Sequence, residues 1–328
     1  MRIAIDLMGG DNAPSEIVAG SMSAAAKYPE HQFILVGKQE VLDSINPLPV
    51  NCCLVAAATV MAMDESVESL RQKRDCSIWL ATKLIKDNEA DAVISAGSTA
   101  AQMASALLLL GRIKGIERPA IASELPSVDG KGRLFLDLGA NSDCTPKQLL
   151  QFAVMGSVYA RVLQGEANPR VALLSNGSED CKGNELTVAA HKLMAQSDLN
   201  FIGNLEGRDL LTGDYNVMVT DGFSGNIALK SIEGTAMTMM SLLKRELTAG
   251  LKRKIGAALV MPGLRNLKGM LDYKEHGGAP LVGVRGVSII CHGSSNAKAI
   301  KNAVAVAVSC LEKDLIGKMT AEAEKIKE

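Results

Sequence analysis

Short polar stretches that contain glycine follow apolar segments at six places in this chain of 328 residues. They read GGDNAP (9–14), SAGSTAA (95–101), DLGANSDCTP (137–146), SNGSEDCKGNE (175–185), TDGFSGN (220–226) and CHGSSNAK (291–298). Glycine lets the backbone turn sharply and approach a ligand, while Ser, Thr, Asn and Asp cap the helix that follows. Exposed N–H groups at a helix start attract anions. Together the stretches favour a ligand that carries phosphate or carboxylate, whereas each alone also fits an ordinary strand–turn–helix connection.

Five side chains in these stretches are candidates for catalysis. Lys182 precedes a helix start, where an ammonium could face a phosphate or a developing oxyanion; the alternative is a solvated loop lysine. Asn184 and Asn226 could donate an amide hydrogen bond to an oxyanion, or simply cap their helices. Asp221 could hold a base or a lysine in place, or form a turn. His292, at a strand end, could act in catalysis or fill a buried structural position.

The first stretch raises a narrower question, because a carboxylate beside a phosphate repels it. We therefore expect Asp11 to brace its loop or to orient a donor, and Gly9, Gly10 and Asn12 to lie nearer the ligand. The full set of residues expected at the phosphate and substrate site is Gly9, Gly10, Asp11, Asn12, Gly97, Ser98, Thr99, Asn141, Asn176, Ser224 and Gly225.

Several other kinds of site are disfavoured. The chain has neither a G-x-x-x-x-G-K-[ST] nor a G-x-G-x-x-G motif, and it lacks the G-x-S-x-G nucleophile elbow. The histidines have no metal-ligand spacing, so we expect no metal and no cofactor. Aromatic residues make up only 3% and the net charge is −1, which argues against a nucleic-acid partner. Seven scattered cysteines without a C-x-x-C pair, and apolar runs too short to span a bilayer, lead us to expect a cytoplasmic protein.

Short apolar runs alternate with longer segments of helical period, which predicts an α/β fold with a mainly parallel sheet and helices on both faces. Strands are expected at 2–6, 32–36, 52–56, 91–95, 120–123, 134–138, 170–174, 200–203, 216–220 and 287–291. Helices are expected at 14–27, 69–86, 99–110, 146–164, 184–196, 226–243 and 296–315. No linker divides the chain, so we expect one domain over 1–328.

A basic segment interrupts this alternation and predicts a helical excursion at 231–276. Residues 244–274 hold eight Lys or Arg and two acids. Leucine or isoleucine recurs every fourth residue from Leu243 to Leu259, and we expect an apolar tip at AALVMPGL (257–264). Such a helix is typical of contact with an anionic membrane surface, the alternative being a helix packed on the core or on a partner. The residues expected to make this contact are Leu259, Val260, Met261, Lys252, Arg253 and Lys254.

Seven ordered motifs over nearly the whole chain resemble the bacterial phosphate acyltransferase (acyl-ACP:phosphate acyltransferase) family of phospholipid synthesis. They are IAIDLMGGDNAP, DESVESLRQKRDCS, ADAVISAGSTAA, LDLGANSDCTP, LLSNGSEDCKGNELT, MVTDGFSGNIALK and DYKEHGGAPLVGVRGVSIICHGSSNAKA. The chain departs from the family at two positions. Ser98 stands where the family usually has Asn in S-A-G-N-T, and His276 stands where an aromatic residue is usual.

The resemblance implies a Rossmann-like fold akin to phosphotransacetylases and isocitrate-type dehydrogenases, and a homodimer. It implies transfer of a long-chain acyl group from acyl carrier protein to inorganic phosphate. It also implies peripheral association with the inner face of the membrane, where a membrane glycerol-3-phosphate acyltransferase takes over the acyl phosphate. On this hypothesis Gly-rich loops and Lys182 hold phosphate, and Asn226 or Asn184 stabilises the oxyanion.

Two other functions stay open at this point. One is a decarboxylating dehydrogenase on the related fold, which would need a metal-binding Asp cluster and a nicotinamide cofactor. The other is a non-catalytic module that binds a phosphorylated or acylated metabolite.

Overall fold

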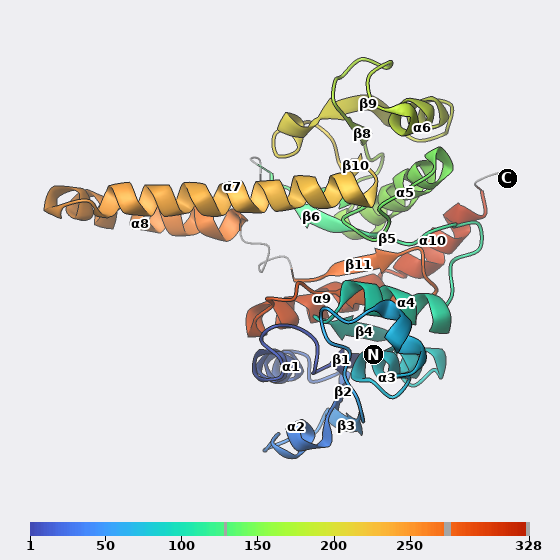
Figure 1. The fold of residues 1–328 in the computed structure, drawn as a ribbon, viewed down its shortest axis with the longest axis vertical. Coiled ribbons are helices and arrows are strands. Elements are labelled where there is room, and N and C mark those ends of the chain that lie inside the picture. Colours follow the sequence, from blue (N-terminus) through green and yellow to red (C-terminus); the bar gives the residue numbers. More distant parts are fainter. Residues whose placement is uncertain (128–129, 272–276, 326–328) are drawn as a thin grey trace.

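The computed structural model describes residues 1–127, 130–271 and 277–325, which form an α/β fold with two β-sheets (Figure 1). The strands of the seven-stranded sheet lie in the order β3 (Cys52–Ala56), β2 (Gln32–Gly37), β1 (Arg2–Asp6), β4 (Ala92–Ser95), β12 (Val287–Ile290), β11 (Ala279–Val282) and β5 (Ala120–Ile121). Its strands are parallel from β3 to β12, and β11 is antiparallel to both of its neighbours. The predicted fold class is therefore confirmed, although β11 was not expected.

The second sheet has five strands, and it begins where one predicted strand divides. Its order is β6 (Ser123–Leu125), β7 (Arg133–Leu136), β10 (Val217–Val219), β8 (Val171–Ser175) and β9 (Phe201–Glu206). The sequence predicts a single strand at 120–123, and this is wrong. Residues 120–121 pair with β11 and residues 123–125 pair with β7, so the chain crosses from one sheet to the other at Ala122.

Helices cover the sheets as the alternating pattern predicts. In chain order they are α1 (Ser15–Lys27), α2 (Gln39–Asp43), α3 (Ser77–Lys86), α4 (Thr99–Leu109), α5 (Pro146–Tyr159), α6 (Glu185–Ala195), α7 (Gly222–Thr248), α8 (Leu251–Leu271), α9 (Ala297–Glu312) and α10 (Leu315–Ala323). However, α2 and α10 were not expected, and the helix predicted at 69–86 begins only at Ser77. Strand β7 shows how side chains alternate between two cores: Leu134 and Leu136 join one apolar cluster, while Phe135 joins another. The first of these clusters contains residues of both sheets, so the sheets share a core.

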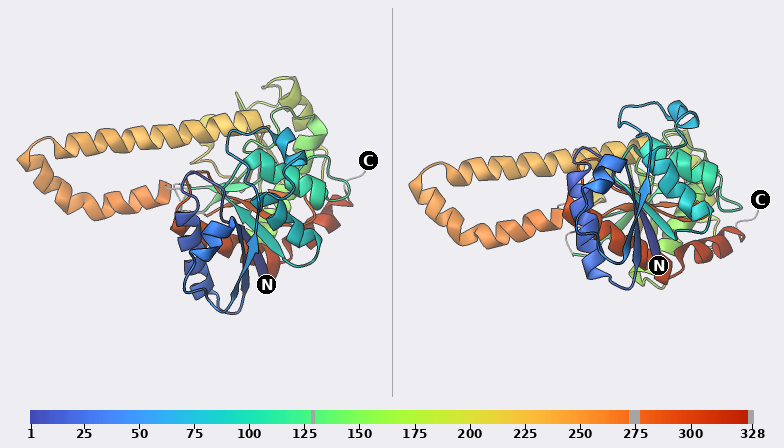
Figure 2. Two further views of the ribbon diagram at one scale, coloured as in Figure 1. Left: turned by 60° about the horizontal axis from the view of Figure 1, so that its bottom comes forward. Right: turned by 90° about the horizontal axis from the view of Figure 1, so that it is seen from below.

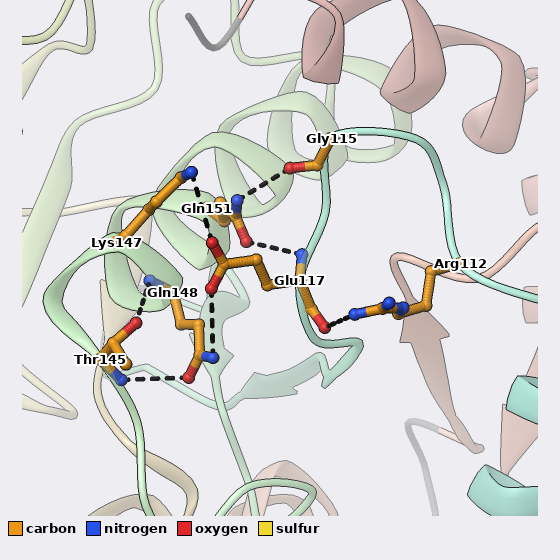
Figure 3. Close-up of polar contacts among 7 residues, drawn as sticks. All are labelled: Arg112, Gly115, Glu117, Thr145, Lys147, Gln148 and Gln151. Carbon is orange, nitrogen blue, oxygen red and sulfur yellow. Dashed lines mark hydrogen bonds and ion pairs between the residues drawn. The ribbon is translucent and has the colours of Figure 1, made fainter. Parts of the chain in front are cut away.

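The loop between α4 and β5 is tied to α5 by polar contacts (Figure 3). The fully buried Gln151 accepts a hydrogen bond from the Glu117 N–H at 2.9 Å and donates one to the Gly115 carbonyl at 2.8 Å. The Glu117 carboxylate pairs with Lys147 Nζ at 3.3 Å and accepts from Gln148 Nε2 at 3.3 Å. These contacts fix the segment that enters β5, where the two sheets meet.

Helices α7 and α8 form a long antiparallel hairpin that projects from the body of the protein (Figure 2). The chain turns at Ala249 and Gly250, where glycine adopts a φ of +103°. The tip predicted at 257–264 is therefore misplaced, because the backbone of α8 stays helical through Pro262 and Gly263. The predicted apolar stripe is also divided between two helices. The end of the predicted excursion, 272–276, lies outside the described residues.

Candidate active site

A cavity of about 470 Å³ lies beyond the carboxyl ends of β1, β4 and β12, between their loops and the start of α7. The loop after β7 and the β5–β6 segment close its other side. Ligands of open parallel sheets bind at this position, where loops run into helix N-termini. The sequence predicts a ligand site at this same edge of the sheet, because its glycine-containing stretches follow these strands.

The loop after β1 and the loop after β4 touch each other, and glycine allows this contact. A Cβ atom on Gly9 would lie 2.5 Å from the Gly97 backbone nitrogen, so no other residue fits without moving the chain. Ser95 holds this contact, because its Oγ accepts from the Gly97 N–H at 3.0 Å and donates to Asp6 Oδ2 at 2.7 Å. Asp6 is buried, and burial raises the pKa of its carboxyl while hydrogen bonds, including that from Ser95, oppose the rise.

The loop after β1 also contacts the loop after β12, and here Asp11 rather than Asn12 lies at the cavity. The Asp11 N–H donates to the Gly293 carbonyl at 2.8 Å, and Asp11 lines the cavity. The Asn12 amide instead donates to the carbonyls of Ser294 and Ser295, at 3.1 and 3.2 Å. Asn12 thus braces the loop, and Asp11 is the residue of this stretch that faces the cavity.

A lysine and a histidine meet at the polar side of the cavity. Lys230 Nζ lies 3.2 Å from His292 Nε2 and 3.1 Å from a Glu233 carboxylate oxygen. Ser294 N and Oγ lie 3.1 and 2.9 Å from His292 Nδ1, and the tautomer of the imidazole sets which ring nitrogen donates. When Nδ1 carries the hydrogen, it can donate to Ser294 Oγ while Nε2 accepts from the Lys230 ammonium. In either tautomer the Lys230 ammonium lies at the cavity wall beside His292, where it can meet the oxygen of an anion.

The loop after β7, on which α7 begins, is built around a buried carboxylate. Asp137 accepts hydrogen bonds from the N–H groups of Ile121, Ala140 and Asn141. Burial raises its pKa, and these donors oppose the rise. The Asn141 amide donates to Asp137 at 2.9 Å and to the Pro119 carbonyl at 2.7 Å, which gives this buried asparagine a bracing position.

Helix α7 packs closely on this loop, which brings Asn226 to the cavity. Asp221 caps the helix by accepting from the Ser224 N–H at 2.8 Å. A Cβ on Gly225 would lie 1.9 Å from the Asp137 carbonyl oxygen, so glycine permits the contact. Asn226 is exposed, lines the cavity and lies beside Gly139.

The structure brings some of the predicted site residues to this cavity and places others elsewhere. Those in the described cavity wall are Asp11, Gly97, Thr99, Asn226 and His292. Those in or beside the same loops but outside the wall are Gly9, Gly10, Asn12, Ser98, Asn141, Asp221, Ser224 and Gly225. Three belong to the loop between β8 and α6 and are not part of the wall: Asn176, Lys182 and Asn184. Asn184 caps α6 through the Thr187 N–H at 2.9 Å.

Sequence reasoning missed Lys230 and Glu233. Lys230 lies four residues after Asn226, which places both on one face of a helix. That spacing is the signal that could have found it, since Asn226 was already a candidate.

Among the described residues, no group of three or more His, Cys, Asp or Glu side chains could hold a metal ion.

The hairpin exposes large apolar side chains next to basic ones. The side chains of Leu259 and Ile255 are 81% and 61% exposed, and Val260 and Met261 are exposed as well. Lys252, Arg253 and Lys254 lie on the same helix and are exposed. No helix within the described ranges is long and apolar enough to cross a membrane.

Comparison with solved structures supports the fold. A phosphotransacetylase from Streptococcus pyogenes superposes with a TM-score of 0.63 at 18% identity, over 94% of this chain and 93% of its own. A 4-hydroxythreonine-4-phosphate dehydrogenase from Klebsiella pneumoniae superposes with a TM-score of 0.50 at 14% identity, over 94% of this chain and 97% of its own. The predicted kinship with phosphotransacetylase and dehydrogenase folds is confirmed.

Comparison with known sequences gives the family. Residues 1–318 match the family described as fatty acid synthesis protein. The phosphate acyltransferase of Desulfitobacterium hafniense is 50% identical over 327 residues, which cover 98% of this chain and 97% of that protein. The phosphate acyltransferase of Heliobacterium modesticaldum is 52% identical over 325 residues, with 96% of each chain covered. The chain therefore belongs to the phosphate acyltransferase family, a family of acyltransferases in fatty acid and phospholipid synthesis.

Proposed function

We propose that this protein transfers a long-chain acyl group from acyl carrier protein to inorganic phosphate, giving acyl phosphate and free carrier protein. The observation that carries the proposal is the Lys230 ammonium, 3.2 Å from the His292 imidazole at a cavity that also holds Asn226. Membership of the phosphate acyltransferase family supports it. The proposal takes Lys230 and His292 as the phosphate site.

The reaction needs positioning more than acid–base activation. An oxygen of hydrogen phosphate dianion attacks the thioester carbonyl to form a tetrahedral intermediate, which then collapses with cleavage of the C–S bond. The proton of the phosphate ends on the sulfur of the carrier protein, and the acyl phosphate leaves as a dianion. Holding the two reactants together supplies much of the rate enhancement, because phosphate is already an anion at neutral pH.

Four polar residues of the cavity have a role in this proposal. Lys230 and His292 donate to phosphate oxygens, and the Asn226 amide donates to the oxyanion of the tetrahedral intermediate. The Asp11 carboxylate accepts a hydrogen bond from the remaining phosphate hydroxyl, which turns an unfavourable neighbour into a specific contact. The backbone beside Gly97 lets phosphate approach the loop closely.

The assignment of Lys182 and Asn184 to the reaction stays a prediction from the sequence. Both lie on the β8–α6 loop rather than in the described cavity wall. Measuring turnover of Lys182→Ala decides it. A loss as large as that of Asn226→Ala would bring this loop into the site, and near wild-type turnover would remove it.

The proposed activity is tested by incubating the protein with acyl-loaded carrier protein, with and without phosphate. We expect free carrier thiol to form only with phosphate, with one equivalent of acyl phosphate trapped as the hydroxamate. Thiol release that does not depend on phosphate would overturn the proposal. Binding of either reactant without turnover would indicate a non-catalytic module, and a nicotinamide requirement would indicate a dehydrogenase.

We further propose that the protein is a homodimer that rests on the inner face of the membrane through the hairpin, where the membrane glycerol-3-phosphate acyltransferase takes its product. Support comes from the exposed apolar side chains of Leu259 and Val260 beside the basic residues of α8. Apolar groups enter the interface while nearby cations attract anionic headgroups. The sequence leaves the acidic carrier protein as an alternative partner of the same basic residues.

Replacing Leu259 and Val260 together by glutamate is expected to weaken binding to vesicles by at least about 100-fold, because two side chains lose their apolar burial. Turnover in solution should be unchanged. The measurement is flotation with phosphatidylglycerol vesicles, alongside the thiol-release assay. Leu108→Glu is the matched control, since Leu108 is 61% exposed on α4 in the body of the protein. Lost turnover with vesicle binding retained would indicate carrier docking instead.

A further inference from the structure

Helix α7 presents two different rows of side chains to the cavity. Asn226, Lys230 and Glu233 form a polar row, and they lie at helical spacings of four and three residues. Leu229, Ile232 and Ala236 form an apolar row beside it, at spacings of three and four. The cavity therefore has a polar side and an apolar side along the same helix.

The apolar row faces an apolar wall from the second sheet and its neighbours. Leu229 and Ile232 pack against the cluster that contains Ile121, Leu125 and Leu138. These three residues also line the cavity. The polar row instead faces the loops after β1 and β12. Lys230 of this row contacts His292. The mechanism proposed above uses only the polar side, so the apolar side is left for another part of the substrate.

We propose that the acyl chain lies along the apolar row of α7, with its carbonyl at Asn226 and its methyl end near Ala236. The size of the side chain at position 236 then limits the length of the acyl group. This inference rests on the proposed function, and it adds the place where the apolar part of the substrate binds.

The distances along the helix fit a medium to long chain. Ten residues separate Asn226 from Ala236, which corresponds to about 15 Å at 1.5 Å per residue. An extended carbon chain advances about 1.2 Å per bond, as an extended main chain does, so about a dozen bonds reach Ala236. Among the described residues of α7, Ala236 is the last that lines the cavity. Its small side chain leaves the path open for longer chains.

The experiment compares Ala236→Phe with the wild type on carrier protein loaded with octanoyl or palmitoyl. Phenylalanine at this position should block the far end of the path. We expect kcat/KM for palmitoyl carrier to fall about 100-fold, since roughly four methylenes lose their apolar contacts, while the value for octanoyl carrier stays within about twofold. Met237→Phe is the matched control, because Met237 is the next residue and is 70% exposed. It should change neither value.

A second measurement does not depend on turnover. Displacement of the fluorescent fatty acid cis-parinaric acid by palmitate should weaken in Ala236→Phe and stay unchanged in Met237→Phe. An equal loss for both chain lengths, or no change in either assay, would overturn the acyl path. If the wild type binds the probe at this position but shows no phosphate-dependent thiol release, the path stands and the proposed reaction fails.

Discussion

Replacing Lys230 by methionine is expected to lower phosphate-dependent turnover by about 100- to 1,000-fold, the usual effect of removing one preorganised donor from a charged transition state. Methionine keeps much of the side-chain length and removes the charge. Lys230 Nζ lies between His292 Nε2 at 3.2 Å and Glu233 at 3.1 Å, so its loss also leaves Glu233 without this ion-pair partner. The measurement is carrier-thiol release as a function of phosphate concentration.

The variant should raise the KM for phosphate and reduce thermal protection by phosphate, because the lost group binds that substrate. Lys230→Arg should recover part of the turnover, since it restores a cation that can reach an anion from the same position. Lys254→Met, on the exposed surface of α8, is the control and should behave as the wild type. Unchanged phosphate dependence in Lys230→Met would remove Lys230 from the phosphate site.

Replacing Gly225 by alanine is expected to destabilise the protein by about 3 kcal/mol or more, in the range of severe overpacking. The new Cβ would lie 1.9 Å from the Asp137 carbonyl oxygen, which is backbone, and the Asp137 N–H donates to the Thr220 carbonyl at 3.0 Å. Relief of the clash requires α7 to move away from the loop after β7. Asn226 would move with the helix, so turnover should fall as well.

Gly234→Ala on the same helix is the matched control. No described heavy atom outside the helix lies within 4 Å of the position of its Cβ, so alanine meets no obstacle there. Alanine is better than glycine in a helix by about 0.5–1 kcal/mol, and we expect a stabilisation of that size. Urea unfolding followed by circular dichroism measures both variants. Equal stability of Gly225→Ala and the wild type would contradict the close packing of α7.

Local patterns in the sequence predict most of the fold. Strands β1 and β3 have the predicted bounds, and the helices that cover the sheets lie where apolar residues have helical period. Strand β11 escaped prediction because Ala279–Val282 follows two glycines and contains Pro280, which are signals of a loop. Glycine and proline both disfavour a helix, so Gly250 and Pro262 are each expected to break one. Only Gly250 lies at a helix end, because α8 continues through Pro262.

The site is less predictable, because long-range contacts decide which side chains face the cavity. The Asn12 amide reaches Ser294, a residue 282 positions away, and no local pattern encodes that contact. For the same reason the sequence could not show that Asp11 rather than Asn12 faces the cavity. Lys230 was missed because the face of α7 that meets the cavity is set by how the helix docks on the neighbouring loops, although the predicted helix already contained this residue. Glycine-containing loops in the sequence indicate an anion site. Which side chain supplies the positive charge of that site depends on how α7 docks against the loops.

Helix α7 runs without a break from the cavity to the hairpin turn. Leu259 lies nine residues beyond Gly250, so in the antiparallel hairpin it stands opposite the part of α7 near Met240. About 14 residues, or roughly 21 Å of helix, separate that level from Asn226. The Debye length at physiological salt is about 8 Å, so at the proposed membrane contact the negative potential of headgroups would be screened over less than this length of helix. On that proposal, the long helix would let the protein collect a phosphate dianion away from a surface that repels dianions.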